Sequence, residues 1–147
     1  MAHWLFKSEP DVFGWDDLVA KGEAEWDGVR NYQARNIMRH MAVGDTGFFY
    51  HSRSGLEIVG IVEVTAEAHP DSTDDSGKWE CVDVRAKDRL ARPVTLDEIK
   101  ADGRFDGMVL VKNSRLSVQP VTSAEWQAIL GLACETSRPE APPERPA

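Results

Sequence analysis

WDGVRNYQARNIMRHMAVGDTGFFYHS, residues 26–52, passes from a turn into a short amphipathic helix and then into an aromatic strand. Gly28 suits the opening turn because glycine tolerates a positive φ. Asn31 is a good N-cap for a helix over residues 31–41, where apolar residues recur at spacings of three and four. Aromatic rings, amides and hydroxyls are concentrated here, and they are the groups that stack on and hydrogen-bond to a flat polar ligand. We therefore expect this stretch to carry a binding site.

The rest of the chain predicts an α+β fold, a small mixed β-barrel of five to six strands with short helices at its ends. A parallel α/β sheet is disfavoured because helices do not alternate with strands. Residues 108–111 suit a buried turn or a strand. One domain over residues 1–134 is expected, followed by a disordered Pro-rich tail over residues 135–147. Strands are expected at residues 2–6, 46–52, 56–69, 78–86 and 115–121, and further helices at 16–21, 95–99 and from Thr122 onward.

Composition excludes several classes of protein. No run of about 20 apolar residues is present, so no membrane helix is expected. The N-terminus does not resemble a secretory signal, and Cys81 and Cys134 match no metal or disulfide spacing. We expect a cytoplasmic protein with reduced thiols.

The formal net charge of −8 argues against a protein that coats nucleic acid by charge alone. The charge is unevenly distributed, however. Residues 28–53 hold four arginines and one acid, whereas residues 63–83 hold seven acids and one lysine. A local basic surface on an acidic protein favours a small, focused contact with an anion, although chance segregation of surface charge gives the same pattern.

The polar and aromatic residues of residues 26–52 suggest a pocket for a base. Trp26, Tyr32 and Tyr50 are candidate walls, and asparagine, histidine and serine side chains are candidate contacts to the edge of a base. For Trp26 and Tyr50 a place in the core is an equally good interpretation, since a ring with a polar tip suits either environment.

An enzymatic interpretation is weaker. His51 suits a general base with Glu9 or Asp27 as its partner, but no catalytic motif accompanies them. The four histidines share no ligand spacing, so neither a metal nor a cofactor is expected. We expect a binding module with no catalytic residues, and keep as an alternative a small enzyme that acts on a nucleoside-like substrate.

Seven segments together resemble the EVE domain family, over residues 2–132. The combination of WDGVRNYQARN with FYHS is specific to that family. The matching segments are WLFKSEP (4–10), WDGVRNYQARN (26–36), GDTGFFYHS (44–52), IVGIVEV (58–64), Pro70 with Asp71, WECVDV (79–84) and RLSVQPVTSAEW (115–126).

The resemblance implies a PUA-like barrel with a pocket for one flipped base, chiefly a modified cytosine in DNA. PUA and YTH relatives bind RNA, so an RNA-binding module is an alternative. No nuclease or helicase is fused to this chain, so a restriction role would need a separate effector protein. The base pocket implied by the resemblance is Ser8, Trp26, Asn31, Tyr32, Asn36, Tyr50, His51 and Ser52. The implied phosphate contacts are Lys7, Arg30, Arg35, Arg39, Arg53 and Arg115.

Overall fold

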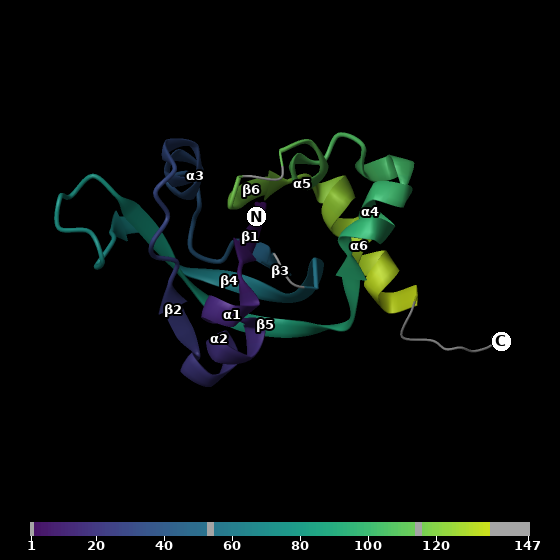
Figure 1. Cartoon of the computed structure of the whole chain (residues 1–147), viewed down its shortest axis with the longest axis horizontal. Helices are drawn as coiled ribbons and strands as arrows, with labels where there is room; N and C mark the ends of the chain where they lie inside the picture. Colours follow the sequence, from purple (N-terminus) through teal and green to yellow (C-terminus); the bar gives the residue numbers. More distant parts are fainter. Residues whose placement is uncertain (1, 53–54, 114–115, 136–147) are drawn as a thin grey trace.

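The computed structural model describes residues 2–52, 55–113 and 116–135 (Figure 1). Its centre is a six-stranded sheet in the order β2-β5-β4-β3-β1-β6. The strands are β1 (His3–Ser8), β2 (Glu23–Glu25), β3 (Thr46–His51), β4 (Glu57–Pro70), β5 (Glu80–Thr95) and β6 (Val118–Val121). The helices are α1 (Pro10–Phe13), α2 (Trp15–Lys21), α3 (Tyr32–Met38), α4 (Leu96–Ala101), the 3-10 turn η1 (Gly103–Phe105), α5 (Val109–Lys112) and α6 (Ser123–Glu135).

The sheet is mixed, as the sequence predicts. Strands β1 and β3 are parallel, and the other pairs are antiparallel. Strands β2 and β6 lie at opposite ends of the strand order, so hydrogen bonds between described residues do not close the barrel. Pro120 lies in β6, an edge strand, where its missing N–H leaves no ladder bond unmade.

Both faces of the sheet are covered, which gives the molecule a core in two halves. Along β3, Phe49 packs into one half, while Phe48 and Tyr50 pack into the other. Alternation along the strand requires this, because neighbouring side chains point to opposite faces. Helices α4, α5 and α6 cover the half that contains Tyr50, and α4 and α6 lie together at one end of the molecule, far from α3 (Figure 1).

Helix starts were well predicted, because their capping residues are explicit in the sequence. The Asn31 side chain accepts a hydrogen bond from the backbone N–H of Ala34 at 2.9 Å. Thr95 with Glu98, and Thr122 with Glu125, make the reciprocal hydrogen bonds of capping boxes. No helix in the described ranges is long and apolar enough to cross a membrane.

Several features differ from the expectations. Helix α3 ends at Met38, three residues before the expected end at residue 41. Strand β2 and helix α1 were not predicted, since each is too short to show a period. Residues 109–112 form helix α5 instead of a buried turn or strand. Strand β5 continues past its expected end at residue 86 to Thr95, and β4 pairs with most of β5. The expected tail begins at Glu135, which ends α6, and residues 136–147 lie outside the described residues.

Gly60 marks a close approach of helix α2 to the sheet, and such approaches are a common reason for glycine inside a strand. A Cβ at this position would lie 2.5 Å from the ring of Trp15, so a side chain there would displace the indole. The register of β4 also shifts beside it. Helix α2 is thereby held directly against the sheet, next to the segment that leads into β2.

Candidate nucleic-acid interface

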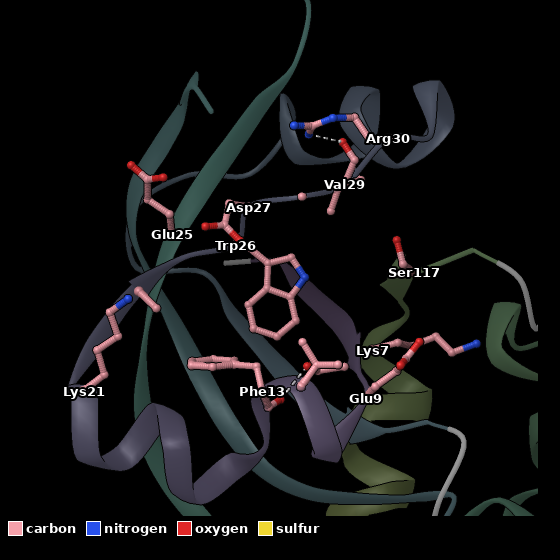
Figure 2. A pocket seen from close by; sticks show the side chains of 14 residues that line it. Lys7, Glu9, Phe13, Lys21, Glu25, Trp26, Asp27, Val29, Arg30 and Ser117 are labelled. Carbon is pink, nitrogen blue, oxygen red and sulfur yellow. Dashed lines mark hydrogen bonds between the residues drawn. The ribbon is translucent and has the colours of Figure 1, made fainter. Parts of the chain in front are cut away.

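A cavity of about 560 Å³ opens where the end of β1, helix α1 and the segment around Trp26 meet. Figure 2 shows the indole of Trp26 in the middle of the lining, with Phe13 and Lys21 on one side and Val29 and Ser117 on the other. The complete lining is Lys7, Ser8, Glu9, Val12, Phe13, Lys21, Ala24, Glu25, Trp26, Asp27, Gly28, Val29, Arg30 and Ser117.

Trp26 belongs both to the core and to the cavity wall. Its side chain is 7% exposed, and its ring makes edge contacts with Phe6 and Phe49 at centroid separations of 5.1 and 5.6 Å. No described residue accepts a hydrogen bond from its indole Nε1–H. The two interpretations of Trp26 left open by the sequence therefore both hold: the ring is packed on the core side and presents a donor at the cavity.

The segment KSEP shapes the floor of the cavity. Pro10 begins helix α1, where its fixed φ is favourable and its missing N–H costs nothing. The backbone carbonyl of Glu9 accepts hydrogen bonds from the N–H groups of Val12 and Phe13, both at 2.9 Å. Ser8 Oγ donates to the carbonyl of Phe13 at 2.5 Å. Ser8 therefore fixes α1 against β1, so that Val12 and Phe13 face the hollow.

The turn after Trp26 is anchored by a carboxylate from another part of the chain. Gly28 has φ 79°, as its place in the turn suggested. Its N–H donates to Asp71 Oδ2 at 2.9 Å, and Arg30 Nη1 donates to the same oxygen at 3.1 Å. Burial would raise the pKa of Asp71, but hydrogen bonds from Thr73, Gly28 and Arg30 lower it below its usual value. Asp71 is thus a fixed anion that orients Arg30.

Charges of both signs line the cavity. Lys7, Lys21 and Arg30 contribute cations, while Glu9, Glu25 and Asp27 contribute carboxylates. Burial lowers the pKa of Lys7. Burial raises the pKa of Asp27, and the neighbouring carboxylates of Asp71 and Glu25 raise it further. The cavity therefore offers both donors and acceptors to a polar ligand.

Four residues of the predicted site meet at this cavity. Ser8 and Trp26 come from the predicted base pocket, and Lys7 and Arg30 from the predicted phosphate contacts. Lys7 lies at the margin, since its ammonium is 5.7 Å from the centre of the Tyr50 ring, on the other side of the sheet. Glu9 and Asp27, first considered as partners of a catalytic histidine, also line the hollow.

The sequence did not reveal the other lining residues, which surround the unpredicted elements α1 and β2. One signal was available: Pro10 after KSE is a favourable first residue of a helix, and a helix there places Val12 and Phe13 beside Trp26. The lining residues missed in this way are Val12, Phe13, Lys21, Ala24, Glu25, Val29 and Ser117.

Three predicted pocket residues lie on strand β3 or directly after it and do not line the cavity. Tyr50 is 2% exposed and packs in the other half of the core, because alternation turns it away from Phe49 and Trp26. His51 Nε2 accepts a hydrogen bond from the N–H of Trp15 at 3.2 Å, and burial lowers the pKa of His51. The His51 imidazole is neutral, already hydrogen-bonded to Trp15 and outside the cavity lining. It therefore does not form the catalytic pair with Glu9 that the sequence suggested. Ser52 donates its backbone N–H to the carbonyl of Ser8 at 2.9 Å.

Three more predicted pocket residues lie in or beside helix α3, next to the cavity but outside its lining. Asn31 uses its side chain as the helix cap. The Asn36 side-chain oxygen accepts hydrogen bonds from Arg35 and Arg39. Tyr32 is 57% exposed and lies against Trp79, with 4.8 Å between ring centroids.

The remaining predicted phosphate contacts are spread over α3 or lie outside the described residues. Arg35 Nη1 donates to the carbonyl of Lys78 at 3.0 Å, and Arg39 Nε donates to Glu80 at 2.6 Å. Arg53 and Arg115 are among the residues that the structure does not describe.

Two groups of side chains within the described ranges are close enough to share a metal ion. One is Glu25, His69 and Asp83, and the other is Glu25, Asp71 and Cys81. In the first, His69 Nε2 and Asp83 Oδ1 are already hydrogen-bonded at 2.7 Å. In the second, Asp71 is engaged by Gly28 and Arg30. At least one member of each group is therefore already engaged by a protein partner.

The EVE domain family model matches residues 2–132. The chain belongs to the EVE domain family. Human thymocyte nuclear protein 1 (THYN1) is 36% identical over an alignment of 165 positions, and the alignment covers 89% of this EVE protein and 73% of the human one. A crystal structure of human THYN1 in complex with 5-methylcytosine-containing DNA has a TM-score of 0.84 at 35% identity, covering 97% of this chain and 100% of that chain.

Two other solved structures support the fold of this EVE protein. The crystal structure of Atu2648 from Agrobacterium tumefaciens is 49% identical, with a TM-score of 0.90 over 97% of this chain and 100% of that chain. The YTH domain of Zygosaccharomyces rouxii MRB1 is 17% identical, with a TM-score of 0.56 over 90% of this chain and 86% of that chain, and this likeness concerns the fold alone. The expected PUA-like architecture is confirmed.

Proposed function

We propose that this EVE domain binds DNA and reads one modified base, a modified cytosine, in the cavity beside Trp26. The observation that carries the proposal is the cavity itself, which the family's motifs KSEP and WDGVR build together. The complex of human THYN1 with 5-methylcytosine-containing DNA supports the choice of ligand.

The size of the cavity suits a single base. Pockets for small ligands typically span about 300–1,000 Å³. A cavity of about 560 Å³ lies inside this range. A base inside a duplex cannot reach such a hollow, so the target nucleotide must be extruded or already unpaired. Extrusion costs a few kcal/mol, and stacking against an aromatic side chain returns about 1–3 kcal/mol per base.

The chemistry of the lining suits a base that carries an amino group. Cytosine presents its N4 amine as a donor, and carboxylates are good acceptors for it. Asp27 and Glu25 place such carboxylates in the lining. The indole N–H of Trp26 supplies a donor for a ring nitrogen or carbonyl oxygen of the base. Thymine would instead present a carbonyl oxygen at the position of the cytosine amine, next to negative charge.

The apolar part of the lining suits a methyl group. Val12, Phe13 and Val29 line the hollow together with Trp26. Figure 2 shows Phe13 and Val29 on two sides of the indole. Burying one methyl group against such side chains contributes about 0.8 kcal/mol, close to a fourfold gain in affinity. A preference for 5-methylcytosine over cytosine is therefore expected to be modest unless the methyl group also eases extrusion.

Two exposed valines provide the test. Val12 is 77% exposed on α1 and lines the cavity, whereas Val19 is 53% exposed on α2 and does not. We expect Val12→Glu to weaken binding to a 5-methylcytosine oligonucleotide about tenfold or more, because a carboxylate at the mouth of the cavity repels the phosphates that flank the base. Val19→Glu adds the same charge and is expected to bind as the parent does.

Binding is measured by fluorescence anisotropy with matched DNA and RNA oligonucleotides, and folding by circular dichroism. Equal affinities of the two folded variants for the methylated DNA would place the base elsewhere and contradict the proposal. A preference for RNA over DNA by the parent would favour the alternative of an RNA-binding module.

A further inference from the structure

Outside the cavity, the exposed ring of Tyr32 lies against the half-buried ring of Trp79. Their ring centroids are 4.8 Å apart, with the planes tilted by 30°. The guanidinium of Arg35 lies 4.9 Å from the centre of the Tyr32 ring and 5.7 Å from that of Trp79. The guanidinium of Arg30 also lies over the Trp79 ring, 5.7 Å from its centre. We call these four residues, Arg30, Tyr32, Arg35 and Trp79, the stacking platform.

The platform is held in place by the loop between β4 and β5. Asp74 Oδ2 accepts a hydrogen bond from the N–H of Trp79 at 3.0 Å, and Asp74 Oδ1 accepts two from Ser76. These hydrogen bonds lower the pKa of Asp74 to about 2, with those from Ser76 foremost. Arg35 closes the loop from the other side by donating to the carbonyl of Lys78. In Figure 1 the loop rises beside α3, at the end of the molecule opposite α4 and α6.

The platform is continuous with the cavity through Arg30. This residue lines the cavity and also lies over the Trp79 ring, while its hydrogen bond to Asp71 holds it between the two. A chain that leaves the cavity past Arg30 therefore meets the platform next. Arginine planes and aromatic rings together are the groups on which unpaired bases stack, and they add positive charge for the backbone.

From this arrangement we infer that the stacking platform receives the nucleotide next to the base held in the cavity. The ligand class is an unpaired nucleotide of the same DNA strand, which stacks on Tyr32 with its phosphate near Arg35. Which base occupies the platform is not discriminated, since every base offers a face for stacking. The inference rests on the proposed function for the identity of the strand.

The platform has a clean test because Tyr32 is largely exposed and alanine is a good helix former at its position in α3. Tyr32→Ala removes the ring, and Tyr32→Phe keeps it. The probes are single-stranded oligodeoxynucleotides with one 5-methylcytosine, either with normal neighbours or with an abasic site on one side or the other, and the unmethylated counterpart with normal neighbours. Dissociation constants of the full chain are measured for each pair of variant and probe.

We expect Tyr32→Ala to bind the probe with normal neighbours about 5- to 100-fold more weakly than the parent, and Tyr32→Phe to bind within about threefold of it. The abasic site on the platform side should weaken the parent and Tyr32→Phe by a similar factor while leaving Tyr32→Ala nearly unchanged. The ratio of affinities for methylated and unmethylated probes should be the same in all three proteins.

Two results separate the platform from the cavity. If the parent prefers the methylated probe and Tyr32→Ala binds every probe as the parent does, the platform inference is wrong and the proposed function stands. Suppose instead that the parent binds methylated and unmethylated probes equally, while Tyr32→Ala and the platform-side abasic site each weaken binding. The platform inference is then supported and the modified-base proposal is wrong. A parent that binds none of the probes overturns both.

Discussion

Asp71 and Arg30 are joined by an ion pair of 3.1 Å in which the Asp71 side chain is fully buried and the Arg30 side chain is 39% exposed. The same carboxylate oxygen accepts the N–H of Gly28, and the other oxygen accepts hydrogen bonds from Thr73. One buried anion therefore fixes the turn that carries Trp26, the cation between cavity and platform, and the start of the loop that carries Trp79. Residues about 40 positions apart in the sequence act as one unit at this point.

Asp71→Asn tests this junction. An amide in place of the carboxylate weakens the hydrogen bonds to Gly28 and Arg30 and leaves a buried NH₂ without an acceptor, so we expect the free energy of unfolding to fall by about 1–3 kcal/mol. DNA affinity should fall as well, because Arg30 is no longer oriented. The matched control is Asp16→Asn, which weakens the exposed ion pair of Asp16 with Arg89 and should change stability by less than about 0.5 kcal/mol. Urea unfolding gives both values, and equal effects would contradict the proposed role of Asp71.

Trp26→Phe separates the hydrogen bond of the indole from its bulk. The phenyl ring keeps the edge contacts to Phe6 and Phe49 in part, while the N–H donor is lost. We expect DNA binding to weaken about tenfold or more with the fold intact, by anisotropy and circular dichroism. Trp26→Ala is less informative, since truncating a large buried ring costs about 3–5 kcal/mol of stability. Unchanged binding by a folded Trp26→Phe would show that the indole N–H does not contact the base.

Asp27→Asn tests how the cavity distinguishes cytosine from thymine. The carboxylate accepts hydrogen bonds only, whereas the amide also donates, so the variant should tolerate a carbonyl where cytosine has its amine. We expect the parent to prefer 5-methylcytosine over thymine in otherwise identical oligonucleotides, and Asp27→Asn to reduce that preference by about tenfold. Asp16→Asn, which removes an exposed carboxylate outside the lining, should leave the preference as it is. An unchanged preference in Asp27→Asn would remove Asp27 from the base contacts.

His69 gives a prediction about pH. Its hydrogen bond to Asp83 is the main cause that raises the pKa of His69 above 6.5 in the folded protein. Because the folded pKa is the higher one, the pair stabilises the protein fully below pH 6.5 and loses this contribution as pH rises through the folded pKa. The difference in unfolding free energy between the parent and His69→Gln should therefore be about 1 kcal/mol in mild acid and shrink toward pH 8. A difference that grows with pH would contradict the pairing.

Some parts of the fold could be predicted from the sequence because their determinants are local. Asn31, Thr95 and Thr122 mark helix starts through their own side chains, and Gly28 marks the turn before α3. Strands β1, β3 and β4 are long enough for their aromatic and β-branched residues to indicate a strand. By contrast, β2 has three residues and α1 has four, which is too short for any period to emerge.

The site was only partly predictable for a different reason. Tyr50 has the right chemistry for a pocket wall, but its face of the sheet is set by the covering helices α4, α5 and α6, which no local pattern reveals. Trp79 was seen only as a strand residue, because its contact with Tyr32 joins α3 to a distant loop. The motifs pointed to segments that line the cavity, and pairing between distant segments decided which side chains meet there.

The most direct measurement of the central claim is the affinity of the parent protein for three oligonucleotides that differ only at one unpaired position: 5-methylcytosine, cytosine or thymine. We expect 5-methylcytosine to bind most tightly and thymine most weakly, and we expect Val12→Glu, unlike Val19→Glu, to weaken binding to 5-methylcytosine. Equal affinities for the three bases, or equal behaviour of the two valine variants, would show that the cavity beside Trp26 does not hold the base.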